Sequence, residues 1–171
     1  MSLDIDTVRF RPAQTGDTDA VRDLWFEGWW DGHGAVAPEG LRRHRDLAGI
    51  AARIPPILAH MTVAEGSGGI LGFVSVKHDE LANFFIARDA RGSGLAPRLL
   101  AEGEAMLAAR GIDEAFLWCA VGNGRAYRFY LREGWRDGGV VQCDVATPDG
   151  PVRLPSHRML KCVTAHTGRS T

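Results

Sequence analysis

Residues 84–100 carry the strongest chemical signal in the sequence. They contain a short apolar segment typical of a strand, then Arg91-Gly92-Ser93-Gly94-Leu95-Ala96, then an amphipathic segment typical of a helix. The first amides of a helix lack intrahelical partners and lie at the positive end of its dipole. Glycines let the chain turn tightly and let an anion approach the backbone without meeting a Cβ atom. The pattern predicts a phosphate-binding loop, with Arg91 and Arg98 adding positive charge.

Pro97 indicates where this helix begins. Proline is tolerated in a first helical turn because its missing N–H needs no partner there, so the helix should start near Gly94. Two other phosphate loops do not fit. Pro97 stands where a dinucleotide-binding fingerprint needs its third glycine, and the Gly-Lys-Ser/Thr of a nucleotide-triphosphate loop is missing. Taken alone, the two glycines could simply form a strand-to-helix turn.

A second motif follows the next apolar segment, and it carries a family resemblance. Residues 123–135 read Asn-Gly-Arg-Ala-Tyr-Arg-Phe-Tyr-Leu-Arg-Glu-Gly-Trp. This order resembles the second half of the cofactor site in GCN5-related N-acetyltransferases (GNATs), and the loop from Arg91 resembles their pyrophosphate loop. The segment Leu71-Gly72-Phe73 resembles part of their central meander. The resemblance covers roughly residues 61–136, and Asp89 departs from it because the family often has Gln or Arg there.

The resemblance implies a fold and a reaction. The fold would be α+β (mixed α/β), a GNAT-like acyl-CoA acyltransferase with a central mixed, mostly antiparallel sheet flanked by helices. The reaction would transfer an acetyl group from acetyl-CoA to a primary amine, with the thioester threaded between two parallel strands. Asn123 would contact the pantetheine arm, cap a helix, or do both. The coenzyme contacts implied are Phe85, Ile86, Arg91, Gly92, Ser93, Gly94, Leu95, Ala96, Asn123 and Tyr130.

Transfer to an amine needs a general base. An aliphatic amine has a reference pKa of about 10.4 and is therefore protonated at neutral pH. The family often keeps its base at the start of the central strand, where this chain has Lys77-His78-Asp79-Glu80. We take Glu80 as the first candidate and His78 as the second. The simpler explanation for both is a solvent-exposed turn charge.

Tyr130 is the candidate general acid. It matches the family position whose hydroxyl lies near the coenzyme sulfur, and a phenol near pKa 10 suits a thiolate whose conjugate acid is near 8.5. The alternative is a core tyrosine beside Phe129. Cys119 lies in an apolar segment and fits a small buried side chain better than an acyl-carrying nucleophile. Direct attack by the amine is therefore expected.

Aromatic residues near the end of the first helix suggest the acceptor side. In the family this region flanks the acceptor cleft, and Trp30 and His33 are the candidate substrate-binding residues, through cation–π contact or stacking. Trp25 and Trp29, four residues apart, fit the buried face of the helix. The basic cluster at residues 42–45 is interpreted as a solvated helix face in preference to a substrate patch.

The elements that must position these residues follow from periodicity and turn signals. We expect strands at 7–13, 61–65, 70–77, 81–86, 115–121, 135–145 and 152–161. We expect a helix from an N-cap at Asp17 toward Trp29, a weaker helical stretch through 41–50, a helix over 94–110 closed by Gly111, and a short helix from 126 ending at Gly134. The domain should span residues 1–163, followed by a polar tail at 164–171.

Bulk properties narrow the setting. The chain has 171 residues, a formal net charge of −1 and three separated cysteines. We therefore expect a reducing, cytoplasmic compartment, with no nucleic-acid partner, no membrane span, no signal peptide and no metal site. The acceptor could be a small-molecule or protein amine, and a homodimer is compatible. The rival functions are a non-catalytic acyl-CoA sensor or interaction module on the same fold, and a nucleotide-binding enzyme using the same loop.

Overall fold

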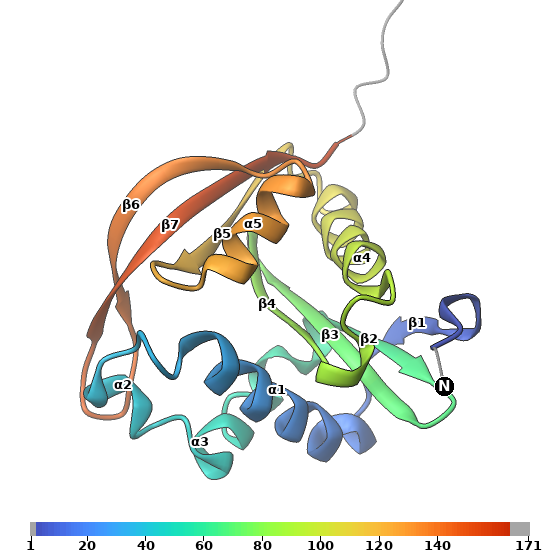
Figure 1. Cartoon of the computed structure of the whole chain (residues 1–171), viewed down its shortest axis with the longest axis horizontal. Coiled ribbons are helices and arrows are strands. Elements are labelled where there is room, and N and C mark those ends of the chain that lie inside the picture. The colour runs from blue at the N-terminus through green and yellow to red at the C-terminus, as the bar shows by residue number, and fades with distance from the viewer. Residues whose placement is uncertain (1–2, 165–171) are drawn as a thin grey trace, which may run out of the picture.

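A computed structural model describes residues 3–164 of the chain. Its centre is one seven-stranded sheet with the strand order β1-β2-β3-β4-β5-β7-β6 (Figure 1). The strands are β1 (Arg9–Pro12), β2 (Met61–Gly66), β3 (Gly69–Lys77), β4 (Glu80–Ile86), β5 (Glu114–Ala120), β6 (Arg136–Val145) and β7 (Val152–Cys162). The α-helices are α1 (Thr18–His33), α2 (Glu39–Arg42), α3 (Leu47–Ala51), α4 (Leu95–Ala109) and α5 (Gly124–Arg132).

Five of the six strand pairings are antiparallel, and only β4 and β5 run parallel. Parallel neighbours need a crossover, which α4 provides. The predicted mixed, mostly antiparallel sheet flanked by helices is therefore confirmed. The weak helical stretch predicted through 41–50 forms two short helices, α2 and α3, instead of one. Of the predicted tail, residues 165–171 lie outside the described part of the chain.

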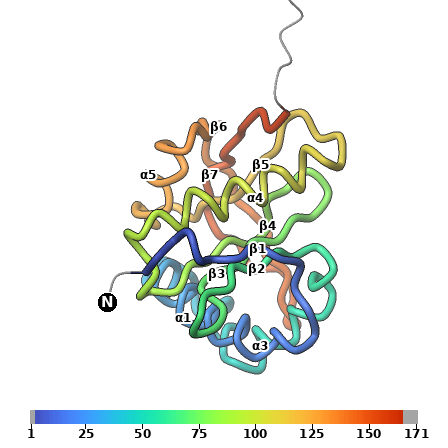
Figure 2. The backbone as a smooth tube through the Cα atoms, turned by 90° about the vertical axis from the view of Figure 1, so that its right-hand side faces the viewer, coloured from blue at the N-terminus to red at the C-terminus, as the bar shows by residue number. Residues whose placement is uncertain are grey.

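Helices cover both faces of the sheet (Figure 2). On one face, α1 and α3 contribute Trp25 and Ile50 to a core that includes Phe73 of β3. On the other face, α4 and α5 contribute Leu99 and Tyr130 to a second core. None of the helices within residues 3–164 is long and apolar enough to cross a membrane.

Helix α1 packs very close to the sheet because two of its residues, Gly28 and Gly32, lack side chains. A Cβ atom at Gly28 would lie 2.6 Å from the Phe85 ring, and one at Gly32 would lie 2.8 Å from Nδ2 of Asn123. Both distances are shorter than a Cβ atom tolerates. The two glycines, four residues apart, therefore let one face of α1 approach both β4 and the start of α5.

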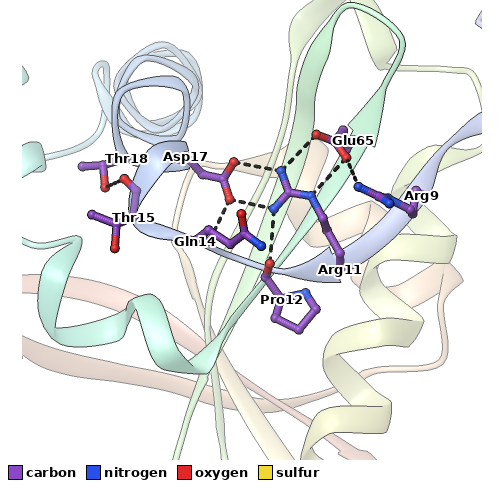
Figure 3. Close-up of polar contacts among 8 residues, drawn as sticks. All are labelled: Arg9, Arg11, Pro12, Gln14, Thr15, Asp17, Thr18 and Glu65. Atoms are coloured by element: carbon purple, nitrogen blue, oxygen red, sulfur yellow. Dashed lines mark hydrogen bonds and ion pairs between the residues drawn. The ribbon is translucent and has the colours of Figure 1, made fainter.

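Asp17 does not cap α1 with its side chain as predicted, although it occupies the N-cap position. Its carboxylate accepts a hydrogen bond from the backbone amide of Gln14 at 2.7 Å and pairs with Arg11 at 2.8 and 2.9 Å (Figure 3). Arg11 also reaches Glu65 of β2 at 3.0 Å. The guanidinium thus ties β1, β2 and the entry to α1 together, and this ion-pair demand outcompetes the cap.

The same ion pairs set the acid sensitivity of the fold. Hydrogen bonds from Arg11, then from Arg9, lower the pKa of Glu65 from 4.5 to about 2. The stability that Glu65 contributes should therefore be complete above pH 4.5 and should be lost as the pH falls toward 2. In Glu65→Gln, urea unfolding between pH 5 and 2 should show a shallower loss of stability than in the wild type. An unchanged slope would contradict the proposed role of this ion pair.

Candidate active site

Strands β4 and β5 separate soon after they begin. Their only paired residues are Glu80 and Phe116, joined where the Phe116 amide donates to the Asp79 carbonyl at 3.1 Å. A bulge in β4 accompanies this separation. Ser75 of β3 faces Asn83 while Val76 faces Leu81, so one residue of β4 between them is unmatched. Bulges bend a strand and increase its twist, which turns the rest of β4 away from β5.

A cleft of about 730 Å³ occupies the space between the two strands. It is lined from the α1 side of the sheet by Trp25, Trp29 and His33, and from the α5 side by Phe129 and Tyr130. It therefore crosses the sheet and can be reached by two molecules from opposite faces. Along its walls, the facing backbone edges of β4 and β5 beyond the first pair make no ladder with each other.

The loop before α4 lies at one end of this cleft. Gly92 and Gly94 adopt left-handed backbone conformations, with φ of 76° and 89°, which favour glycine. Both glycines line the cleft. In the described part of the chain, the amides of Gly92, Ser93 and Gly94 donate to no protein group. The helix begins with Leu95 after Gly94, as predicted, and has no side-chain cap, so its N-terminal donors remain available.

Ser93 and Leu95 were predicted as coenzyme contacts but do not line the cleft. The Ser93 hydroxyl donates to the Ala90 carbonyl at 2.6 Å and accepts from the Leu95 amide at 3.3 Å. The Leu95 side chain is fully buried in the core under α4. The side chains of both residues therefore hold the loop in shape, while its glycines face the cleft.

The charges around the loop differ in part from those predicted. Arg91 lines the cleft and pairs with Asp31 of α1 at 3.0 Å, and Arg88 pairs with the same carboxylate at 2.6 Å. Arg98 is not part of this group, because it donates to the Ile5 carbonyl at 3.0 Å. The prediction that it serves the phosphate site is wrong.

Arg125 is a further cleft residue that the sequence analysis did not single out. Burial and then the neighbouring Arg91 lower its pKa. It makes no hydrogen bond or ion pair with the residues that the structure describes. Its signal in the sequence was its place two residues after Asn123, inside the second motif.

Asn123 caps α5, one of the two roles predicted for it. Its side-chain oxygen accepts from the Ala126 amide at 3.4 Å. The residue also lines the cleft, with its Nδ2 directed at α1 beside Gly32. The cap uses the side-chain oxygen, so the Nδ2 group of Asn123 can still donate to a molecule in the cleft.

Tyr130 is 8% exposed and lines the cleft. Burial, and then the nearby Cys119, raise the pKa of its hydroxyl. None of the residues in the described range hydrogen-bonds to this hydroxyl. The phenol is therefore protonated at neutral pH and free to donate. Cys119 is also buried, and burial followed by the charge of Asp137 raises the pKa of its thiol to about 11, so it remains a neutral thiol.

The two candidate bases occupy different places. Glu80 is partly buried and lines the cleft, and burial, the largest effect, raises its pKa. His78 lies in the exposed turn before β4 with φ of 53°, and it lines a separate hollow with His60 and Arg110 instead. The geometry therefore favours Glu80 as the group that can reach a molecule in the cleft.

Of the two residues predicted to bind the acceptor, only one lines the cleft. His33 lines the cleft and stacks on Trp29 with ring centroids 5.4 Å apart. Burial, followed by the charge of Arg45, lowers its pKa, so the ring is neutral at pH 7. Trp30 does not line the cleft. Its indole Nε1 donates to the Arg45 carbonyl at 2.9 Å, so it positions the chain at Arg45 instead of lining the site.

Arg45 itself corrects the interpretation of the basic cluster at 42–45. It is only 3% exposed and lines the cleft together with Arg53. Periodicity could not reveal this, because the burial of Arg45 arises from tertiary packing, in which its guanidinium lies over the Trp29 ring of α1. Within residues 3–164, no group of three or more His, Cys, Asp or Glu side chains could hold a metal ion.

Comparisons with known families decide the family to which this fold and cleft belong. Residues 12–135 match the family model described as "Acetyltransferase (GNAT) family". The chain belongs to the GNAT acetyltransferase family. The match covers the loop, the splayed strands and the second motif, so it includes every part of the cleft that the sequence predicted for a coenzyme. As a member of this family, the protein is an acyltransferase.

Solved GNAT structures share the fold at low identity. A GCN5-related N-acetyltransferase from Rhodopseudomonas palustris is 19% identical with a TM-score of 0.71, over 91% of this chain and 96% of that one. PaiA N-acetyltransferase from Thermoplasma acidophilum, solved with coenzyme A, is 18% identical with a TM-score of 0.65, over 91% and 98%. YncA from Salmonella typhimurium, solved with acetyl-CoA, is 18% identical with a TM-score of 0.63, over 93% and 95%. A comparison with curated proteins finds no match.

The close packing of α1 on β4 can be tested at Gly28. In Gly28→Ala, the new methyl group would overlap the Phe85 ring, and overpacking of this kind costs ~1–3 kcal/mol, less the ~1 kcal/mol that alanine gains in a helix. Urea denaturation should therefore show a loss of up to about 2 kcal/mol. Gly16→Ala is the control, because nothing lies within 4 Å of its Cβ position. Equal stability of the two variants would show that α1 does not need this glycine.

Proposed function

We propose that this chain transfers an acetyl group from acetyl-CoA to a primary amine by direct attack. The observation that carries the proposal is the cleft through the β4–β5 splay, with unpaired amides at one end and access from both faces of the sheet. Such a site can hold a long thioester on one side and an amine on the other. Relatives solved with coenzyme A or acetyl-CoA share the fold, which supports acetyl-CoA as the cosubstrate.

The loop amides of Gly92, Ser93 and Gly94 would bind the coenzyme diphosphate. Their donors are free, and the α4 dipole favours an anion there. Arg91 and Arg125 would add positive charge, and Asp31 would keep Arg91 in position. Ala96 lines the cleft in the first turn of α4, and Leu95 contributes through the loop shape.

The pantetheine arm would lie along the open edge of β4. Phe85 and Ile86 line this part of the cleft, and backbone groups that lack a strand partner can bind the amides of the arm. The same donors would polarise the thioester carbonyl and stabilise the negative charge that develops on its oxygen. Asn123 would support the arm from the start of α5.

Glu80 would act as the general base. Making the amine neutral at pH 7 costs on the order of 4–5 kcal/mol, and Glu80 can take that proton directly or through one water. Its raised pKa makes it a stronger base than an exposed carboxylate. The second candidate base, His78, would need a turn rearrangement to reach the cleft.

The reaction begins once Glu80 has taken a proton from the ammonium group of the acceptor. The neutral amine nitrogen attacks the thioester carbon and a C–N bond forms. The nitrogen of the tetrahedral intermediate loses its second proton to solvent, the C–S bond breaks, and the coenzyme leaves as a thiolate. Tyr130 donates its proton to that sulfur, and solvent later returns a proton to Tyr130 and removes one from Glu80.

Tyr130→Phe and Glu80→Gln test these two roles. Each should lower kcat by at least about tenfold, equivalent to roughly 1.4 kcal/mol, while coenzyme binding persists. Thiol release from acetyl-CoA with a panel of amines is the measurement. Because the charged form of Glu80 is the base, wild-type activity should fall as the pH drops through its raised pKa, and Glu80→Gln should lose that acidic limb.

Two matched variants serve as controls. Tyr127 bonds to Asp137 outside the cleft, and Glu27 is an exposed residue of α1, so Tyr127→Phe and Glu27→Gln should keep normal activity. Unreduced turnover in Tyr130→Phe and Glu80→Gln would refute the proposed acid and base. Coenzyme binding without turnover of any amine would favour a non-catalytic sensor.

Gly94→Ala tests the coenzyme loop. A side chain in a left-handed conformation costs roughly 1–2 kcal/mol, so the loop should relax and lose its aligned amides. The thermal stabilisation produced by coenzyme A should fall strongly. Gly68→Ala in the β2–β3 turn is the control, because its Cβ position is open. Full stabilisation of Gly94→Ala by coenzyme A would contradict binding at this loop.

A further inference from the structure

Two arginines, Arg45 and Arg53, line the cleft from the chain segment that follows α1. Neither forms an ion pair with a carboxylate of residues 3–164. Arg45 is 97% buried; its Nε has no hydrogen-bond partner, and its Nη1 reaches only the His44 carbonyl at 3.3 Å. By contrast, Arg42 also has an unpartnered Nε, but it pairs with Glu39 and does not line the cleft.

The environment of the two guanidinium groups is costly for free cations. Burial, then repulsion from Arg53, lowers the pKa of Arg45 to about 10, and burial also lowers the pKa of Arg53. Arg45 therefore remains charged at neutral pH. Buried charges are normally paired, so this part of the cleft favours an anion.

Aromatic rings hold both guanidinium groups in place. Arg45 lies over Trp29 at 5.7 Å and Arg53 over Trp25 at 5.1 Å, and Trp30 anchors the Arg45 backbone. Cation–π contact offsets part of the cost of burial, but it supplies no hydrogen-bond acceptor. Two guanidinium groups with unused donors therefore line the cleft, an arrangement suited to a carboxylate.

The cleft also carries the opposite charge. Glu80 lines it, and the groups that shift its pKa are Lys77, Asp79 and His78, not the two arginines. Neither arginine therefore pairs with Glu80. A molecule with an ammonium group and a carboxylate would complement both, whereas a polyamine would meet two buried cations.

We infer that the acceptor is an amine that carries a carboxylate, in the manner of an α-amino acid, and that Arg45 and Arg53 bind this carboxylate while the amine faces Glu80 and the thioester. This inference rests on the proposed acetyl transfer and specifies its substrate class.

Matched pairs of amines that differ only in the carboxylate test the inference. We would compare phenylalanine with phenethylamine, tryptophan with tryptamine, and alanine with ethylamine, and add spermidine and O-phosphoethanolamine. In at least one pair the amino acid should have a kcat/KM about ten- to a hundredfold higher, as expected for charge-assisted hydrogen bonds. That ratio should fall toward one in Arg53→Gln and Arg45→Gln.

Arg43→Gln is the matched control, because Arg43 is exposed and does not line the cleft; it should keep the wild-type ratio. If Arg45→Gln fails to fold, Arg53→Gln still decides. Equal turnover with and without the carboxylate, or preference for spermidine or O-phosphoethanolamine, would overturn the inference while leaving acetyl transfer intact.

A binding measurement separates the two levels of the proposal. Calorimetry with N-acetylphenylalanine and N-acetylphenethylamine, in the presence of coenzyme A, needs no turnover. Tighter binding of the acid, lost in Arg53→Gln, supports the carboxylate site even if none of the amines is acetylated. Equal binding refutes it. Failure of the proposed function has a different signature, namely no thiol release from acetyl-CoA with any amine of the panel.

Discussion

The site depends on one constraint, the early separation of the parallel strands β4 and β5. Strands that run side by side normally satisfy each other's backbone groups, and these two stop doing so after a single pair. The bulge in β4 turns that strand away from β5. Gly28 lets α1 pack closely on β4, and Gly32 lets it pack closely on the start of α5. The core on each face stays closed, so the opening is a local feature of a well-packed sheet.

Because the opening crosses the sheet, the two faces can have different chemistry. The α4 side offers backbone donors at a helix start, together with Arg91 and Arg125, and suits a diphosphate. The α1 side offers Trp25 and Trp29 beneath two arginines and suits a smaller, charged acceptor. Glu80 and Tyr130 line the same cleft, as the proposed base and acid require.

Local sequence signals predicted the parts of the site that local physics determines. Gly92 and Gly94 need no distant partner to adopt a left-handed conformation. Asn123 caps α5 by accepting a hydrogen bond from the amide three residues further along the chain. Features set by packing escaped prediction. Arg98 and Asp17 bind partners other than the ones expected from the sequence. Arg45 stands in a basic run that resembled a solvated face, but in the fold it packs over Trp29. The bulge in β4 contains no glycine or proline, so the sequence carries no local signal for it.

The central claim is that the main-chain donors before α4 hold the coenzyme. The most direct measurement is a titration of ¹⁵N-labelled protein with coenzyme A, followed by backbone amide resonances. Saturable shifts that are largest at Gly92, Ser93 and Gly94 and continue along β4 are the result that the account predicts. If those three amides stay unmoved while the ligand binds elsewhere, or if it does not bind, the account is contradicted.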